Sequence, residues 1–466
     1  MRAALAQILP SLPGARLVAD SGEVVFAGVS TDSRNVSAGS LFVALRGEVF
    51  DAHNFLAQVA EKGVAAVVVE ELPEGWAEST RIAAIVVPNT LTALGQIANH
   101  WRRQFAMPVI GVTGSNGKTT VKEMIAAILA AAHGEEGRLA TRGNLNNEIG
   151  VPLTLFRMEA KQQSAVIEMG MNHPGEIGRL AAIAEAGIAM VNNAQREHQE
   201  FMHTVEAVAR ENGAVLAALP GDGVAVFPYG DEFTPVWEEL AAGRRALRFG
   251  LTKDAEVSCT FRAGDFGSEM FITISEAEGD AQQFFVNLQA AGEHNVRNAL
   301  AAAACTYAAG IALDKIKLGL DTFAPVSGRL QKKAAVNGAV VIDDSYNANP
   351  DSVRAAIDVL AKAAAPRVLV LGDMGEVGTQ GREFHEEIGA YAQSKGIEQV
   401  LVTGELAAHM QGASVRHFEN FGDLLAAVDA AATPDATVLI KGSRFMKMER
   451  VVQHLIGSQQ ANKESH

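Results

Sequence analysis

A glycine-rich segment near residue 115 carries the residue types that hold a polyphosphate. The segment Gly111–Thr120 has the sequence GVTGSNGKTT, follows a short apolar run and precedes a run with helical spacing. Gly114 and Gly117 let backbone N–H groups turn toward a phosphate, and the start of a helix adds partial positive charge. Lys118 is then expected to reach the β- and γ-phosphates, and Thr119 to bind Mg²⁺. The residues predicted to hold the nucleotide here are Gly114, Ser115, Asn116, Gly117, Lys118, Thr119 and Thr120.

This segment departs from the standard phosphate-loop pattern at one position. The pattern Gly-x₄-Gly-Lys-[Ser/Thr] ending at Gly117 requires glycine where Val112 stands, and glycines occupy positions 111 and 114 instead. The alternative is a glycine-rich turn followed by an incidental Lys-Thr pair. The strand, loop and helix pattern around the segment favours the phosphate loop.

Two further side chains follow predicted strands and are candidates for the same site. Glu168 ends the apolar run 165–167, and His198 comes after the run Ala189–Asn193. Carboxyl ends of strands face the crevice where α/β sheets bind ligands, and a phosphate loop needs a carboxylate to help hold Mg²⁺. We therefore expect Thr119, Glu168 and His198 to bind the metal. The alternatives are a solvated surface glutamate and a hydrogen-bonded structural histidine.

The elements that must position these residues alternate in kind along the chain. Short β-branched runs predict strands, and Ala-rich segments between them have helical spacing, as in the run 121–132. This alternation favours parallel sheets covered by helices, so we predict the α/β class. The patch 247–286 predicts an antiparallel extension, and the uncharged run Ala299–Leu313 a buried helix. The predicted strands are Val64–Val69, Ile85–Val87, Val109–Val112, Ala165–Glu168, Ala189–Asn192, Ala339–Asp343, Val368–Leu371, Gln399–Val402 and Thr437–Lys441.

Length and composition limit the function classes. The 466 residues are enough for about three domains, which we place at residues 1–105, 106–325 and 326–466. With 39 Lys and Arg against 54 Asp and Glu, the formal charge is −15, which argues against nucleic acid or an anionic membrane as partner. Cys259 and Cys305 are too few for a disulfide scaffold. We find no convincing signal peptide or membrane span and expect a cytoplasmic monomer.

The phosphate-loop residues together with Glu168 and His198 resemble the ATP site of the Mur ligases, which build the peptide stem of bacterial cell-wall precursors. The resemblance covers nearly the whole chain. It implies an N-terminal UDP-sugar-binding domain, a central P-loop ATPase domain with a parallel sheet, and a Rossmann-like C-terminal domain that binds the incoming D-alanyl-D-alanine. The stretches that carry it further are Gly143–Thr154, Asp343–Asp351, Leu371–Glu376 and Lys441–Arg444 with Met448 and Glu449.

The resemblance also implies roles for residues outside the phosphate loop. Asn295, at the start of an Ala-rich helix, is expected to contact adenine. Arg329 is expected to neutralise γ-phosphate charge, Asp344 to bind ribose or orient Arg329, and Tyr346 to lie near the nucleotide. Without the resemblance, a helix N-cap would be the preferred interpretation of Asn295, and a domain-surface ion pair that of Arg329 and Asp344. The catalytic set is Lys118, Glu168, His198 and Arg329.

Substrate-binding residues are implied at three places in the chain. The N-terminal set, expected at the uridine or phosphate, has a surface turn with a structural Asp–Arg pair as its alternative. The C-terminal pair, expected at the dipeptide, has a helix cap or turn as its alternative. The three groups are Ser33, Arg34, Asp51 and His53; Asn144, Asn146 and Asn147; and Asn347 and Asn349.

One position departs from the family pattern in a way that affects the metal site. Many Mur ligases carry a lysine, carbamylated by CO₂, about fourteen residues after the metal-site histidine. Here that position is Asn212, which cannot form a carbamate. We therefore expect no carbamylated lysine, and leave open how a second Mg²⁺ would be held, with Glu211 one candidate.

The activity that the resemblance implies is ATP- and Mg²⁺-dependent amide ligation. An acyl phosphate formed on UDP-MurNAc-tripeptide would be attacked by the amine of D-alanyl-D-alanine, giving UDP-MurNAc-pentapeptide for peptidoglycan synthesis. Two alternatives stay open: another ligase of the superfamily, of the folylpolyglutamate synthetase type, and a non-catalytic ATP-dependent switch.

Overall fold

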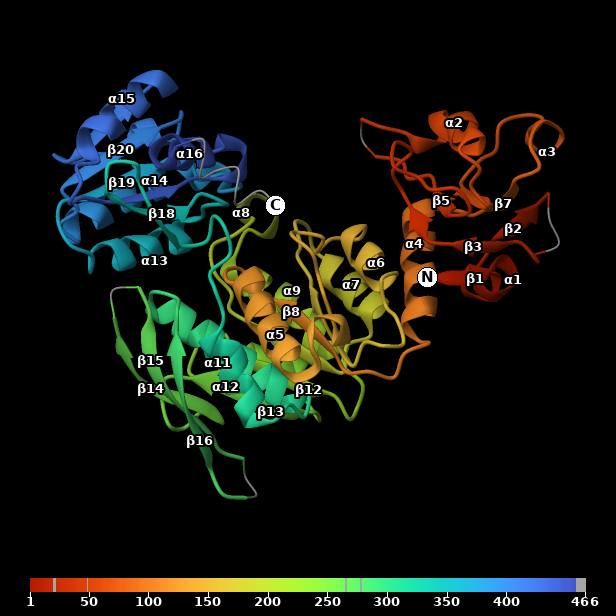
Figure 1. The fold of residues 1–466 in the computed structure, drawn as a ribbon, viewed down its shortest axis with the longest axis horizontal. Helices are drawn as coiled ribbons and strands as arrows, with labels where there is room; N and C mark the ends of the chain where they lie inside the picture. The colour runs from red at the N-terminus through yellow and green to blue at the C-terminus, as the bar shows by residue number, and fades with distance from the viewer. Residues whose placement is uncertain (20–21, 48, 265, 277–278, 458–466) are drawn as a thin grey trace.

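The computed structural model describes residues 1–19, 22–47, 49–264, 266–276 and 279–457. Its three lobes follow the order of the chain, and the central lobe lies between the N-terminal and C-terminal lobes (Figure 1). The predicted domain boundaries, near residues 105 and 325, fall in the connections 103–108 and 322–330 between regular elements. Among the described residues, no helix combines the length and apolar character needed to cross a membrane.

The N-terminal lobe is a small mixed sheet with short helices. Its main sheet has the order β2-β7-β6-β5-β4, in which β4 to β7 are parallel and β2 is antiparallel; β1 and β3 form a separate antiparallel pair. The strands are β1 (Arg2–Ala4), β2 (Arg16–Val18), β3 (Val25–Ala27), β4 (Val29–Ser30), β5 (Leu41–Val43), β6 (Ala66–Val69) and β7 (Ala83–Val86); the helices are α1 (Leu5–Ile8), α2 (Leu56–Glu61), α3 (Trp76–Ser79) and α4 (Thr90–Arg102).

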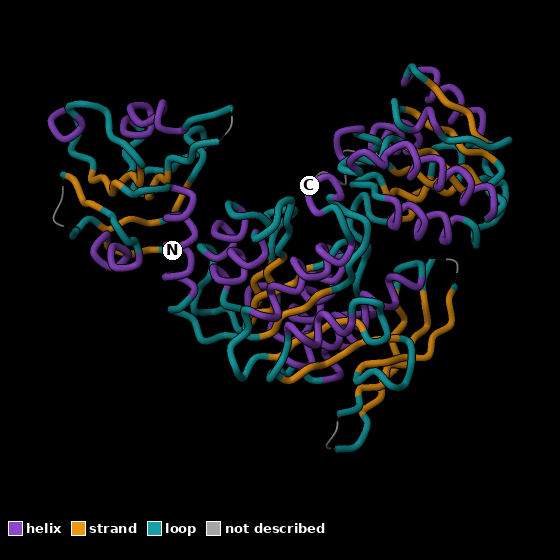
Figure 2. Tube along the Cα trace, turned by 180° about the vertical axis from the view of Figure 1, so that it is seen from behind, coloured by secondary structure: helices purple, strands orange, loops and turns teal. Residues whose placement is uncertain are grey.

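The central lobe is built on a sheet with the order β16-β15-β14-β13-β12-β11-β8-β10-β9. Strands from β9 to β14 in this order are parallel, as predicted, and β14, β15 and β16 pair antiparallel, which confirms the predicted extension. Figure 2 shows these last strands projecting from the lobe. The strands are β8 (Val109–Thr113), β9 (Arg138–Ala140), β10 (Ser164–Glu168), β11 (Ile188–Val191), β12 (Val224–Pro228), β13 (Arg245–Gly250), β14 (Val257–Ala263), β15 (Ser268–Ile274) and β16 (Gln282–Leu288).

Helices cover both faces of the central sheet because its strands are apolar on both sides. One core contains α5, α11 and α12, and the other contains α6, α7 and α9 and continues into α4 of the N-terminal lobe. The predicted buried helix over Ala299–Leu313 is too long: α11 ends at Ala308, because Gly310 adopts φ +78° and turns the chain. The helices are α5 (Lys118–His133), α6 (Gly150–Leu155), α7 (Glu176–Ala184), α8 (Gln199–Met202), α9 (Val205–Ala217), α10 (Thr234–Leu240), α11 (Glu293–Ala308) and α12 (Leu313–Asp321).

The C-terminal lobe is a second α/β sheet, with the order β17-β18-β22-β19-β20-β21. All neighbouring pairs are parallel except β17 with β18. Its elements are β17 (Gln331–Ala334), β18 (Val340–Asp344), α13 (Pro350–Leu360), β19 (Arg367–Leu371), α14 (Gly381–Ser394), β20 (Gln399–Thr403), β21 (Val415–Phe418), α15 (Phe421–Ala431), β22 (Thr437–Lys441) and α16 (Glu449–Ile456).

The register of the two large sheets places the functional candidates at strand ends. In the central sheet, Glu168 of β10 pairs with Val112 of β8 just before the phosphate loop. In the C-terminal sheet, Asp344 of β18 pairs with Lys441 of β22. Both positions are carboxyl ends of parallel strands, where open α/β sheets bind ligands.

Candidate active site between the central and C-terminal domains

A cavity of about 900 Å³ lies between the carboxyl ends of these two sheets. Its lining combines the phosphate loop and Glu168 with Arg329, Asp344 and Lys441 from beyond residue 325. Residues 144, 146 and 147 also line it, as do Asn295, Tyr346, Asn347 and Asn349. The structure therefore brings together nearly all predicted site residues outside the N-terminal lobe.

The phosphate loop has the geometry that its glycines predict. Gly114 has φ +132° and Gly117 has φ +80°. A Cβ at Gly117 would lie 2.6 Å from the side-chain atoms of Asn192 and Asn298, so a larger residue does not fit there without movement. Helix α5 begins directly after it, and the N–H groups of a first helical turn have no partner within the helix. An anion placed over Lys118 and Thr119 would meet these groups.

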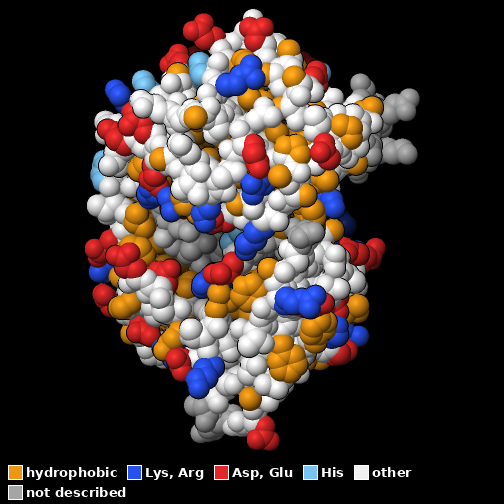
Figure 3. All heavy atoms as spheres, turned by 90° about the vertical axis from the view of Figure 1, so that its left-hand side faces the viewer, with side chains coloured by type: hydrophobic (Ala, Val, Ile, Leu, Met, Phe, Trp, Pro, Cys, Tyr) orange, Lys and Arg blue, Asp and Glu red, His pale blue; other side chains and the backbone are white. Residues whose placement is uncertain are grey.

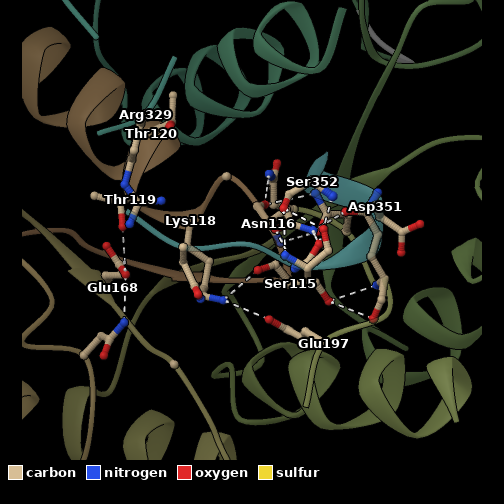
Figure 4. A pocket seen from close by; sticks show the side chains of 18 of the residues that line it. Ser115, Asn116, Lys118, Thr119, Thr120, Glu168, Glu197, Arg329, Asp351 and Ser352 are labelled. Carbon is tan, nitrogen blue, oxygen red and sulfur yellow. Dashed lines mark hydrogen bonds and ion pairs between the residues drawn. The ribbon is translucent and has the colours of Figure 1, made fainter. Parts of the chain in front are cut away.

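Lys118 is held inside this loop by neighbouring oxygens. Its Nζ donates to the backbone oxygens of Gly114 and, at 3.0 Å, Ser115. The carboxylate of Glu197 lies 3.6 Å away and completes the surroundings of the ammonium group (Figure 4). The charge of Lys118 is thus oriented at the loop and partly neutralised.

Glu168 has the surroundings expected of a carboxylate that binds a cation. It is only 2% exposed, and its Oε1 accepts hydrogen bonds from Thr119 Oγ1 at 3.2 Å and Asn146 Nδ2 at 2.8 Å. Its Oε2 is buried and has no hydrogen-bond partner among the described residues. A buried carboxylate oxygen without a partner is costly unless a ligand satisfies it. Hard oxygen donors beside phosphates suit Mg²⁺, so Glu168 and Thr119 fit this ion.

His198 lines the same cavity but faces the C-terminal domain. Its Nδ1 lies 2.8 Å from Glu376 Oε2, and this contact lowers the pKa of the Glu376 carboxyl. His198 itself has φ +47°, an unfavourable conformation for a residue with a Cβ. Among the described residues, no group of three or more His, Cys, Asp or Glu side chains is arranged to hold a metal. The role of His198 as a metal ligand stays a prediction.

Asp344 and Lys441 form a buried ion pair on the C-terminal side of the cavity. Lys441 Nζ lies 2.6 Å from Asp344 Oδ2, and the backbone N–H of Leu330 donates to Oδ1 at 3.1 Å. Burial raises the pKa of the Asp344 carboxyl, although Lys441 and Arg329 act in the opposite direction. Arg329 stacks on Tyr346, with Cζ 4.2 Å from the ring centroid.

The asparagines of the site are largely engaged in hydrogen bonds. Asn295 donates to Ala291 O at 2.7 Å and accepts from Asn298 at 3.0 Å. Asn147 Oδ1 accepts from the N–H groups of Ile149 and Gly150 near the start of α6, and the carbonyl of Asn347 accepts from Lys441. Asn349 caps α13, as the alternative interpretation of the sequence had it. It also pairs with the phosphate-loop residue Asn116.

The N-terminal set lies outside the residues that line the cavity in the described part of the chain. Arg34 pairs with Asp32 and leaves 84% of its side chain exposed, as the surface-turn alternative had it. Asp51 contacts His53 Nδ1 at 2.6 Å, and His53 Nε2 accepts from the N–H of Glu70. Ser33 is buried beside the turn.

Sequence reasoning missed several residues that support the phosphate loop. They follow the end of β11 in an irregular segment, where the sequence carries no local signal of such a role. Asn193 Oδ1 accepts from the N–H of Asn116, and Glu211, a candidate metal ligand from sequence, instead caps the start of α7. The missed residues are Asn192, Asn193, Gln195, Arg196 and Glu197.

The two cysteines lie away from this chemistry. Cys259 and Cys305 are buried free thiols. Burial raises the pKa of Cys259 to about 11 and that of Cys305 further still. Neither thiol is therefore available as a thiolate nucleophile near neutral pH.

Comparison with known proteins agrees with this organisation. Three family models match the chain: "Mur ligase family, catalytic domain" over residues 25–102, "Mur ligase middle domain" over 112–306, and "Mur ligase, glutamate ligase domain" over 328–444.

Relatives of the same description cover almost the whole chain. The UDP-N-acetylmuramoyl-tripeptide–D-alanyl-D-alanine ligase of Escherichia coli is 36% identical over 93% of this chain and 94% of its own length. That of Bacillus subtilis is 35% identical over 94% of each chain. A crystal structure of MurF from Acinetobacter baumannii superposes with a TM-score of 0.90 at 32% identity, covering 98% of this chain and 99% of the other. The chain belongs to the Mur ligase family.

Proposed function

We propose that this chain is the Mur ligase that joins D-alanyl-D-alanine to UDP-N-acetylmuramoyl-tripeptide with ATP. The observation that carries the proposal is the single cavity in which Lys118, Thr119 and Glu168 face Arg329, Asp344 and Lys441. The names of relatives that align over nearly the full length give the substrates. Such a cavity holds a nucleotide on one domain and presents cationic groups from the other.

Forming an amide from a free carboxylate is thermodynamically unfavourable in water, so the reaction requires ATP. In the proposed reaction, the terminal carboxylate oxygen of the tripeptide attacks the γ-phosphorus of ATP, and ADP leaves. The dipeptide amine then attacks the acyl carbon, gives up a proton, and expels inorganic phosphate. Lys118 and Arg329 spread the charge of the transferred phosphoryl group, so catalysis consists of positioning and electrostatic stabilisation.

Thr119 and Glu168 are the residues that would hold Mg²⁺. The ion would neutralise charge on the phosphates and keep them in line with the attacking oxygen. Asn146 donates to the same oxygen of Glu168 as Thr119 and so fixes the carboxylate orientation. The buried, unpartnered Oε2 of Glu168 supports this assignment.

The N-terminal domain is proposed to bind the UDP part of the substrate. Arg34 is its most accessible candidate, because its guanidinium is exposed and, among the described residues, pairs only with the exposed turn residue Asp32. A guanidinium fork can exchange such a carboxylate for a pyrophosphate with similar geometry. His53 is bonded at both ring nitrogens, so it positions the loop that carries Asp51.

Product formation tests the function directly. The protein is incubated with ATP, Mg²⁺ and UDP-MurNAc-tripeptide, with and without D-alanyl-D-alanine, and phosphate release is followed together with product mass. Release that requires both substrates, with a pentapeptide product, is expected. Release without either substrate points to the nucleotide-switch alternative, and release with a folate acceptor and glutamate points to the folylpolyglutamate alternative.

A further inference from the structure

The segment 195–198 bridges the phosphate loop and the C-terminal domain. On the loop side, the N–H of Gln195 donates to Ser115 Oγ at 2.9 Å, and Gln195 Oε1 accepts from Asn116 Nδ2 at 2.6 Å. Two residues further along, Glu197 faces Lys118. His198 reaches Glu376 of the C-terminal domain. We call residues 195–198 the bridge segment.

Arg196 makes the largest set of contacts from this segment to the C-terminal domain. Its backbone N–H donates to Asp351 Oδ2 at 2.9 Å, and its Nη2 to Asp351 Oδ1 at 2.6 Å. Its Nη1 donates to Glu387 Oε2 at 2.7 Å, and its Cζ lies 5.2 Å from the ring centroid of Phe384. One guanidinium thus joins α13 and α14 to the bridge segment.

The ion pairs of Arg196 with Asp351 and Glu387 are largely shielded from solvent, so they can stabilise the contact between the domains. The Arg196 side chain is only 24% exposed, and those of Asp351 and Glu387 are 22% and 33% exposed. Charged pairs of this kind are screened less by salt than surface pairs, and a guanidinium that donates to two carboxylates is geometrically specific. Charged side chains of both signs also gather along the seam between the upper and lower lobes in Figure 3.

A second contact across the same seam lies two residues before Asp351, at the N-cap of α13. The amide of Asn349, the cap of α13, pairs with that of Asn116 at 2.9 and 3.2 Å. The start of α13 is therefore held to the central domain at Asn349 and at Asp351. This arrangement presents Arg329, Asp344 and Lys441 to the phosphate loop in one cavity.

We propose that Arg196 is a positioning residue: by binding Asp351 and Glu387, it holds the C-terminal domain in the orientation in which Arg329 faces the nucleotide site. Because Arg196 is adjacent to Glu197, the same contact couples this orientation to the carboxylate beside Lys118. The inference rests on the proposed ligase function for its kinetic consequence, but its structural consequence does not depend on that function.

The test compares Arg196→Ala, Asp351→Asn, the double variant and Arg196→Lys in the full chain. The matched control is Arg382→Ala, which removes an exposed arginine that pairs with Glu386 within α14. Small-angle X-ray scattering with and without a non-hydrolysable ATP analogue reports domain orientation, and steady-state kinetics separate kcat from KM for ATP. Thermal unfolding monitors folding.

Arg196→Ala is expected to increase the radius of gyration and to lower kcat/KM for ATP by about tenfold or more, with a melting temperature close to that of Arg382→Ala. Asp351→Asn shows a smaller change in the same direction, because Arg196 keeps its contact with Glu387. The double variant is close to Arg196→Ala, because Arg196→Ala already removes the side-chain contact with Asp351. Arg196→Lys recovers part of the loss, since lysine keeps the charge without the fork.

Wild-type scattering and wild-type kcat/KM in Arg196→Ala overturn the proposal, as do fully additive effects in the double variant. Should Arg196→Ala fail to fold, Glu387→Gln replaces it in the same measurements. If the wild type itself makes no product, the proposed function fails, whereas the scattering comparison still decides the role of Arg196.

Discussion

The side-chain oxygen of Asn212 accepts a hydrogen bond at 3.0 Å from the backbone N–H of Gly114, where β8 passes into the phosphate loop. Asn212 is 1% exposed, and its Nδ2 lies 3.5 Å from Glu197 Oε1. Its own carbonyl accepts from Thr113 Oγ1. The neutral amide of Asn212 therefore supports the phosphate loop at Gly114 and orients the carboxylate of Glu197 beside Lys118.

Replacing Asn212 by leucine should destabilise the loop that it supports. The variant leaves the N–H of Gly114 buried without its acceptor, which costs about 1–3 kcal/mol. We expect a lower free energy of unfolding and weaker binding of an ATP analogue, measured by denaturant titration and calorimetry. Asn212→Asp keeps the acceptor oxygen but places a second carboxylate beside Glu197, so it should be destabilised relative to the wild type by like-charge repulsion. Unchanged stability and affinity in Asn212→Leu would contradict the supporting role.

Loss of the Lys118 ammonium should remove most of the turnover. In Lys118→Ala, the developing charge on the γ-phosphoryl loses a positioned cation, and single donors of this kind are worth about 100- to 1000-fold in rate. The measurement is pentapeptide formation under saturating substrates. Lys315→Ala is the matched control, because Lys315 is a partly exposed lysine on α12 that pairs with Asp314. Full activity of a folded Lys118→Ala protein rules out the proposed site.

Glu168→Gln should change the Mg²⁺ requirement more than the fold. The glutamine oxygen can still accept from Thr119 and Asn146, but the amide replaces the buried Oε2 that has no partner among the described residues. We expect the Mg²⁺ concentration for half-maximal activity to rise by about tenfold or more. Paramagnetic resonance of Mn²⁺ with the ATP analogue reports the same loss without turnover. An unchanged metal requirement means that Glu168 does not bind the ion.

Local sequence patterns predicted the parts of the site that lie within one strand–loop–helix unit. The phosphate loop and Glu168 follow from apolar runs and from the residues that end them, because strand ends meet at one sheet edge. The same patterns cannot predict contacts between domains: Arg196 and Asp351 are 155 positions apart, and Asn116 and Asn349 are 233 apart. Which surfaces meet depends on how the three lobes pack against one another.

The sequence also does not show which local partners a predicted site residue has. The family resemblance implied that Arg34 and His53 contact the substrate, and the structure shows in addition the local partners Asp32, Asp51 and Glu70. The helix predicted over Ala299–Leu313 is too long at its C-terminal end. The prediction followed the apolar composition of the segment, whereas the helix ends at Ala308, just before Gly310. The end of a helix depends on single residues, so the mean composition of a segment does not locate it.

Lys441→Met should destabilise the C-terminal domain in a pH-dependent way. The variant leaves Asp344 buried without its ammonium partner, and breaking such a pair costs about 3–5 kcal/mol. In the wild type, burial raises the pKa of the Asp344 carboxyl and the ammonium of Lys441 acts against this shift, so removing Lys441 raises the pKa further. A raised carboxyl pKa gives stability that is present at low pH and lost as pH rises through the folded-state pKa.

The stability difference between wild type and Lys441→Met should therefore be largest near neutral pH and shrink as the solution is acidified, as measured by urea unfolding across pH. In the Asp344→Asn background no carboxyl titrates at this position, so the stability difference between Asp344→Asn and Asp344→Asn with Lys441→Met should not depend on pH. A difference that stays constant with pH in the single variant would mean that the Asp344 charge is not what Lys441 stabilises.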